Sequence, residues 1–238
     1  MKADILRRLV DARAAKRPAA LVTDLGTGMQ SIVLDDGVHG AFGMTDEELA
    51  LVRRHLALDR SAIVEQDERS WFVHAFNPPL RLAIVGAVHI AQALAPVAAL
   101  SGYDVVIVDP RRAFATETRF PGVALSDDWP DDGLRAIGID RRTAVVTLTH
   151  DPKLDDPALQ VALRSPAFYV GSLGSRRTHA KRVARLREAG FSEAEIARIR
   201  APVGLDIGAV SPAEIAVAIM AEITATLRAS TGDGAEDG

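Results

Sequence analysis

The spacing of apolar and polar residues changes character near residue 79 of this 238-residue chain. Before that point, apolar positions at helical spacing predict a helix over residues 1–17, and a capping box, Thr45 with Glu48, predicts another over about 46–57. Short apolar runs of strand length occur at residues 20–24, 31–34, 62–65 and 71–76. We therefore predict a small α+β N-terminal domain over residues 1–78.

From residue 79 to 230, continuous apolar runs alternate with helical segments. Strands are predicted at residues 82–85, 105–108, 123–125, 144–149 and 168–170. Helices are predicted after Gly86 as far as Leu100, at 155–164, at 177–189 and in a last segment with isoleucines at four-residue spacing. This order is typical of a parallel sheet covered on both faces. The predicted fold class is α/β, with a Rossmann-like, doubly wound parallel sheet, and residues 231–238 are predicted to be a disordered tail.

Composition narrows the classes of function. The formal net charge of −4 gives no indication of nucleic-acid binding. The chain has no cysteine, which excludes a disulfide, a thiolate metal site and a persulfide carried on this chain, and its six histidines show no metal-ligand spacing. No apolar stretch reaches 18 residues and the N-terminus has no signal-peptide pattern, so we expect a cytoplasmic protein without a membrane span.

The first glycine turn, Gly86-Ala87-Val88-His89, follows the first predicted strand of the second domain. A dinucleotide-binding turn has glycine at the position of Val88, where the backbone approaches a pyrophosphate. Asp109 ends the next strand, where an acidic residue would bind a ribose hydroxyl, and Arg111 follows, where it could equally bind a phosphate. Two interpretations stay open: a dinucleotide site, or a turn of this shape that binds no nucleotide.

Polar residues also follow the predicted strand at 144–149. Thr149, His150 and Asp151 are expected at the mouth of a site, because ligands of open α/β sheets bind beyond the carboxyl ends of the strands. His150 and Asp151 suit an acid–base pair or hydrogen bonding to a ligand. Asp155 and Asp156 are interpreted instead as candidate N-caps of the following helix.

A second glycine turn opens a strongly basic helix. Free backbone N–H groups and the helix dipole favour an anion there, and two arginines add charge. The turn consists of Gly171, Ser172, Gly174, Ser175, Arg176 and Arg177. Farther along, Lys181, Arg182 and Arg185 predict a solvated or partner-docking face, and His179 fits either group. Asp206, between two glycines, predicts a loop that closes over the pocket or merely connects two elements.

Together these segments resemble the XdhC/CoxI family, accessory proteins of molybdenum hydroxylases. The resemblance covers about residues 80–225 and is carried by Gly86 to Pro96, Leu148 to Lys153, Phe168 to His179, Phe191 to Glu195 and Ala201 to Gly208. It implies a C-terminal Rossmann domain behind a smaller N-terminal domain. Much of the family has a second glycine where this chain has Val88, and many members carry an N-terminal cysteine that this chain lacks.

The resemblance implies a chaperone-like maturation factor rather than an enzyme. Such a protein binds molybdenum cofactor, as molybdopterin or in its dinucleotide form, assists its sulfuration and inserts it into a xanthine dehydrogenase or CO dehydrogenase type enzyme. The implied partners are an apo molybdenum hydroxylase and a cysteine desulfurase, since this chain has no thiol. A homodimer is left open. The alternative is an NAD(P)-dependent oxidoreductase with His150 as the acid; Val88 argues against tight NAD(P) binding.

Overall fold

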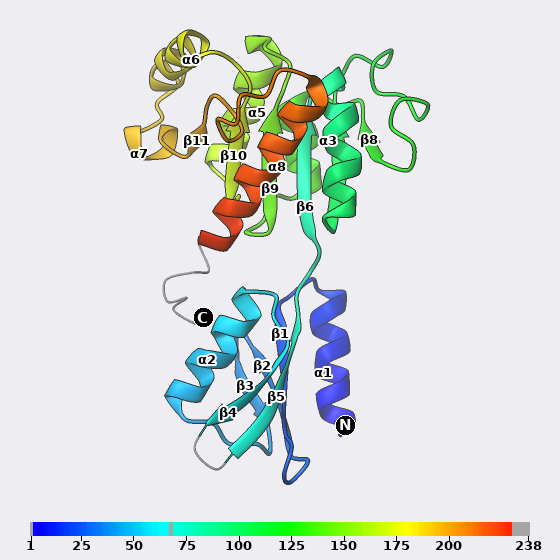
Figure 1. The fold of residues 1–238 in the computed structure, drawn as a ribbon, viewed down its shortest axis with the longest axis vertical. Helices are drawn as coiled ribbons and strands as arrows, with labels where there is room; N and C mark the ends of the chain where they lie inside the picture. Colours follow the sequence, from blue (N-terminus) through cyan, green and yellow to red (C-terminus); the bar gives the residue numbers. More distant parts are fainter. Residues whose placement is uncertain (1, 67–68, 230–238) are drawn as a thin grey trace. The chain divides into compact units, whose positions relative to one another are not determined.

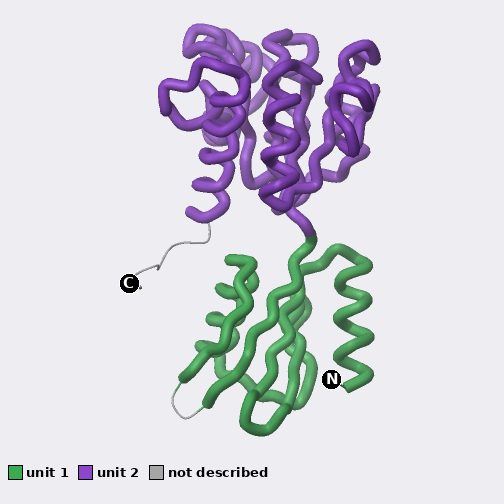
Figure 2. The backbone as a smooth tube through the Cα atoms, turned by 45° about the vertical axis from the view of Figure 1, so that its right-hand side comes forward, with its two compact units in different colours: residues 1–78, 231–238 green, residues 79–230 purple. Residues whose placement is uncertain are grey.

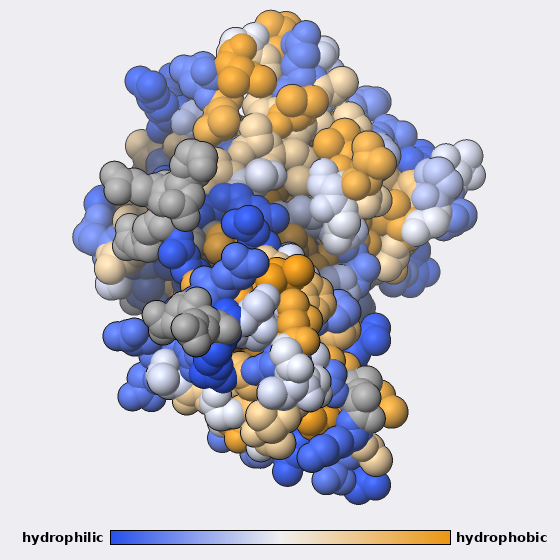
Figure 3. All heavy atoms as spheres, turned by 60° about the horizontal axis from the view of Figure 1, so that its bottom comes forward, coloured by the Kyte–Doolittle hydropathy of each residue, from blue (hydrophilic) through white to orange (hydrophobic). Residues whose placement is uncertain are grey.

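The computed structural model describes residues 2–66 and 69–229, which form two compact units (Figures 1 and 2). The first unit extends to Pro78 and the second begins at Pro79. The predicted tail at 231–238 lies outside the described residues. None of the described helices is long and apolar enough to cross a membrane. Apolar and hydrophilic residues are interspersed on the face displayed in Figure 3.

The described part of the first unit is an antiparallel sheet with a helix on each face. Its strand order is β3-β2-β1-β5-β4, with adjacent strands antiparallel. The strands are β1 (Ala19–Asp24), β2 (Gln30–Leu34), β3 (Gly37–Gly40), β4 (Ala62–Gln66) and β5 (Arg69–Phe76), and the helices are α1 (Ala3–Ala14) and α2 (Asp46–Ala57). Side chains alternate along β1, so that Ala20 and Val22 join the core under α2 while Leu21 joins the core under α1.

The second unit, described from residue 79 to 229, contains a six-stranded parallel sheet. Its strands are β6 (Leu80–Val85), β7 (Tyr103–Val108), β8 (Ala124–Ser126), β9 (Thr143–Thr147), β10 (Tyr169–Ser172) and β11 (Ile199–Arg200). Their spatial order is β11-β10-β9-β6-β7-β8, all pairs parallel. Numbered along this unit, that is the Rossmann order, which reverses direction between β6 and β9. The predicted fold class is confirmed.

Helices cover both faces of the parallel sheet. On one face, α3 and α8 pack over Leu82 and Ile84 of β6; on the other, the remaining helices pack over Ala83 and Val85. The helices are α3 (His89–Leu100), α4 (Pro130–Ile137), α5 (Pro152–Leu163), α6 (Arg176–Glu188), α7 (Glu193–Ile196) and α8 (Pro212–Ala229). Because β6 is buried on both faces, it is apolar without alternation.

The structure differs from the sequence predictions in particular elements. Three short elements were not predicted: β3, α4 and β11. Helix α5 begins at Pro152, and its N-cap is Asp151, whose carboxylate accepts a hydrogen bond from the Lys153 N–H at 2.9 Å. The prediction that Asp155 or Asp156 caps this helix was therefore wrong. Pro152 at the first helical position lets the helix start one turn earlier.

Gly86 ends β6 where the sheet order reverses. Its φ of +109° lies in the region that favours glycine. A Cβ atom at this position would stand 2.6 Å from the Thr149 Cγ2 atom, at the end of the neighbouring strand β9. Glycine is thus required both by the backbone conformation and by the side chain beside it.

We predict that Gly86→Ala lowers the free energy of unfolding by about 2–4 kcal/mol in urea titration, from roughly 1–2 kcal/mol of backbone strain and roughly 1–3 kcal/mol of overpacking. The control is Gly102→Ala, where φ is +85° and no atom lies within 4 Å, so that only the backbone cost applies. Thr149→Ser should restore part of the loss in the Gly86→Ala background. Equal losses at positions 86 and 102 would contradict the steric explanation.

Candidate functional site

Three of the predicted clusters come together at the carboxyl edge of the parallel sheet. They follow β6, β9 and β10, which are neighbours in the sheet and point the same way. Figure 1 shows α6 at the end toward which β6 points. The edge between β6 and β9 is the reversal point of a doubly wound sheet, where such folds bind ligands.

Asp109 locks the first glycine turn to the end of β7. Its carboxylate is fully buried and accepts hydrogen bonds from the Ala87 N–H at 2.8 Å and from the Arg111 guanidinium at 2.7 and 2.9 Å. Burial alone would raise the pKa of Asp109, but the hydrogen bonds from Arg111 and Ala87 outweigh it and hold the pKa below its ordinary value. A ribose hydroxyl at Asp109 would have to displace one of these donors.

Val88 and His89 form the start of α3. Val88 is the half-buried N-cap residue and offers no side-chain hydrogen bond to the helix, and His89 is the exposed first residue. The N-terminus of α3 therefore keeps backbone donors without a side-chain cap.

The cluster after β9 is built around Thr149. Its hydroxyl donates to Asp155 Oδ1 at 2.7 Å. The next residue, His150, is exposed and has φ +61°, a conformation uncommon outside glycine and one that is enriched at functional sites. The pKa of Arg111 is raised chiefly by its hydrogen bond to Asp109, and the charges of Asp151 and Asp155 act in the same direction, so the ends of β7 and β9 interact electrostatically.

Several residues of the second glycine turn have structural roles. Gly171 has no room for a Cβ atom, which would stand 2.6 Å from Val203 Cγ2. The buried Ser172 hydroxyl lies 2.6 Å from that of Thr147, and Ser175 is the N-cap of α6. Gly174 has φ +140°. The exposed Arg176 and Arg177 are left to meet a ligand, and they line two different cavities.

The first of these cavities, the α5–α6 pocket, has a volume of about 210 Å³. It is lined by His150, Pro152, Asp155, Asp156, Arg177, Thr178, Lys181, Arg182 and Arg185. The sequence predicted two of these, His150 and Arg177, as site residues. The prediction of a solvated or docking face was wrong for Arg182, whose side chain is only 2% exposed, because α6 turns this residue toward α5.

Arg182 and Asp155 form a buried pair with unused hydrogen-bonding atoms. Arg182 Nη2 donates to the Leu173 carbonyl at 3.0 Å and lies 3.8 Å from Asp155 Oδ2. Arg182 Nε and Nη1 and Asp155 Oδ2 are buried and have no partner among the described residues. Burial raises the pKa of Asp155 and lowers that of Arg182. Unpaired buried groups cost roughly 1–3 kcal/mol each, so this arrangement fits a site that receives a ligand.

The second cavity, the loop pocket, has a volume of about 420 Å³ and brings Arg176 and Asp206 together. Its other lining residues are Leu173, residues 202–205 and 207–209, Ile215 and Ala218. Asp206 is exposed. Glu222 of α8 holds this loop, because its Oε2 atom accepts from the Tyr169 hydroxyl at 2.5 Å and from the Gly204 N–H at 2.8 Å.

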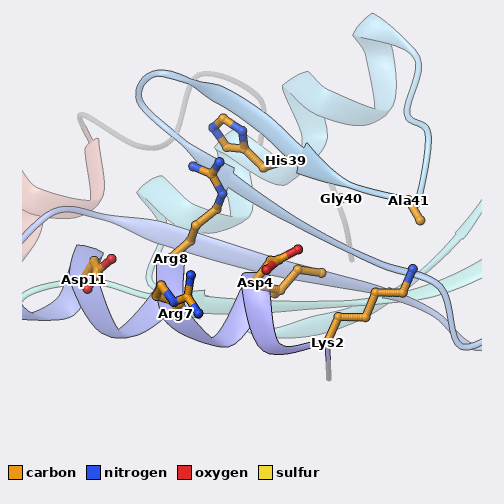
Figure 4. A pocket seen from close by; sticks show the side chains of 9 residues that line it. Lys2, Asp4, Arg7, Arg8, Asp11, His39, Gly40 and Ala41 are labelled. Carbon is orange, nitrogen blue, oxygen red and sulfur yellow. The ribbon is translucent and has the colours of Figure 1, made fainter.

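A larger cavity, of about 650 Å³, lies in the first unit between α1 and the end of β3 (Figure 4). Both charge signs line it, with Arg7 and Arg8 beside Asp4 and Asp11. None of its described lining residues carries a buried polar atom without a partner. Size alone therefore favours this cavity, and the chemistry favours the pockets beside α6.

Comparison with known proteins identifies relatives of the second unit. Residues 82–223 match the family described as the XdhC Rossmann domain. The chain is 38% identical over 152 residues to the molybdenum cofactor insertion chaperone PaoD of Escherichia coli, covering 64% of this chain and 42% of PaoD. It is 33% identical over 156 residues to a protein of Bacillus subtilis named as a probable xanthine dehydrogenase component, covering 65% and 45%. The chain thus spans less than half the length of these relatives.

A solved structure is similar over both units. The crystal structure of a xanthine dehydrogenase from Bacillus halodurans is 26% identical, with a TM-score of 0.73. The similarity covers 94% of this chain and 66% of that one.

We predict that Asp109→Asn lowers the free energy of unfolding by about 2–4 kcal/mol at pH 7, since a buried carboxylate with three donors is lost. The folded-state pKa is depressed, so the contribution is present above the unfolded-state value of about 3.9 and is lost as pH falls through the folded value. The difference between the two proteins should therefore narrow below about pH 4. Urea titrations across pH measure it, with the exposed Asp104→Asn as control. A pH-independent difference would contradict the assignment.

Proposed function

Because this chain belongs to the XdhC family, we propose that its second unit binds molybdenum cofactor as cargo and takes part in its maturation. In this proposal the protein assists sulfuration and hands the cofactor to an apo molybdenum hydroxylase of the xanthine dehydrogenase or CO dehydrogenase type. One coincidence supports it: family membership over residues 82–223 goes together with two cavities at the N-terminus of a basic helix. A relative named as a molybdenum cofactor insertion chaperone supports it further.

The residues at these cavities fit a phosphorylated, planar cofactor. Arg176 and Arg177 add charge at the N-terminus of α6, where the helix dipole favours a phosphate. The unpaired donors of Arg182 suit an anion as well. Leu173 and Ile215 give the loop pocket an apolar lining for the pterin ring, and the exposed carboxylate of Asp206 can accept from its N–H groups.

The side chains after β9 would complete the site. Thr149, His150 and Asp151 stand at the reversal point of the sheet, where they would face the pterin or the oxygen atoms on the metal. Sulfur must come from a partner, a cysteine desulfurase, because the chain has no cysteine. We propose no substrate turnover by this protein. The cofactor form is treated below, and a homodimer remains a hypothesis.

We predict that deleting the gene leaves molybdenum hydroxylase polypeptide present but inactive, without cofactor or without its sulfido ligand. The wild-type gene should restore activity, and the Arg176→Ala/Arg177→Ala variant should restore less than a tenth of it, because two charge-assisted contacts of roughly 1.5–3 kcal/mol each are removed. The control variant is Arg187→Ala, on the same helix but paired with Glu193. Fully loaded hydroxylase in the deletion strain, with no paralogue in the genome, would rule the proposal out.

The alternative, an NAD(P)-dependent oxidoreductase, retains the Rossmann strand order in its favour. Against it, Val88 occupies the position where a pyrophosphate approaches the backbone, and the Asp109 carboxylate is already engaged.

We predict that NADPH binds more weakly than micromolar and that Val88→Gly tightens binding, whereas Val88→Ala, which keeps a Cβ atom, improves it less. Fluorescence titration of the bound nicotinamide measures both. Micromolar or tighter binding to the unmodified protein would favour the oxidoreductase.

A further inference from the structure

The α5–α6 pocket combines an excess of positive charge with a buried hydrogen-bond acceptor. Among its described lining residues, four are Arg or Lys and two are Asp. Arg185 neutralises one of the two, Asp156, through a bidentate contact. The charges left to a ligand are those of Arg177, Lys181 and Arg182 against the single carboxylate of Asp155. The pocket therefore suits an anion.

The buried atoms specify what kind of anion. Arg182 keeps Nε and Nη1 as unused donors, and Asp155 keeps Oδ2 as an unused acceptor, 3.8 Å from Arg182 Nη2. A ligand that satisfies both must accept from the guanidinium and donate to the carboxylate. A fully ionised oxyanion such as sulfate has no proton to donate, whereas a phosphate monoester retains one, with a second pKa of about 6.

We propose that the α5–α6 pocket is a phosphate-monoester site, in which Arg182 donates to the phosphate and Asp155 accepts a hydrogen bond from its P–O–H group. The volume of about 210 Å³ lies below the range of roughly 300–1,000 Å³ for whole small-molecule ligands, so the pocket takes one end of a molecule. His150, in its left-handed conformation, lines the pocket.

This site deepens the proposed function and rests on it for the identity of the cargo. A bridging phosphate of a dinucleotide has no P–O–H group near neutral pH and leaves Asp155 unpaired. The pocket therefore selects the cofactor form with a terminal phosphate, molybdopterin, over the dinucleotide form.

The experiment is calorimetric titration of the full chain at pH 6 with inorganic phosphate and, separately, with sulfate. We expect phosphate to bind at least tenfold more tightly than sulfate, since sulfate leaves a buried acceptor unpaired. Asp155→Asn, which replaces the acceptor with a donor amide, should bring the ratio of the two affinities close to one. Arg182→Gln should weaken both anions at least tenfold. Arg187→Gln on the same helix should change neither.

Each outcome decides. Equal affinities of the wild-type protein for the two anions, or no phosphate binding at millimolar concentration, overturn the proposal without reference to any variant. Thermal melting of Asp155→Asn and Arg182→Gln identifies a variant that has lost its fold, and the wild-type comparison then stands alone. Unchanged molybdopterin binding by a folded Arg182→Gln overturns the pocket but leaves the proposed function standing. Phosphate selectivity without any molybdopterin binding does the reverse.

Discussion

The contact between Gly86 and the Thr149 side chain is the constraint on which the carboxyl edge of the parallel sheet depends. It joins the ends of β6 and β9 at the point where the strand order reverses. From Thr149 a continuous series of contacts runs outward. Its hydroxyl binds Asp155, Asp155 faces Arg182, and Arg182 binds the Leu173 carbonyl at the second glycine turn. One packed threonine thereby relates the first glycine turn to the N-terminus of α6.

Much of the fold follows from patterns that the sequence displays locally. β6 and β9 are apolar without alternation because both faces are covered, and the capping box at Thr45 and Glu48 forms as the residue types require. The elements that escaped prediction are short: β11 has two residues and β3 is the glycine-flanked sequence GVHG. Such segments form strands only because a neighbouring strand supplies hydrogen bonds, and that is a tertiary effect.

The candidate site was predictable in position but not in detail. Glycines and polar residues at strand ends identified the edge, because parallel strands bring their carboxyl ends together. Arg182 could not be distinguished from Arg185 by composition, since both belong to one basic helix. What separates them is the rotation of α6 against α5, which buries one side chain and leaves the other paired with Asp156 at the rim. Asp155 escaped for the same reason, because a helix cap and a buried acceptor look alike in sequence.

The position of α8 has a consequence for how the chain folds during synthesis. Everything in the first unit's two described cores lies before residue 78, so that unit can fold while translation continues. The parallel sheet cannot be finished so early, because Ile219 and Ile223 of α8 cover the same face as Leu82 of β6, about 140 residues before them in the chain. Until α8 leaves the ribosome, that face of the sheet is exposed and is the segment most in need of a folding chaperone.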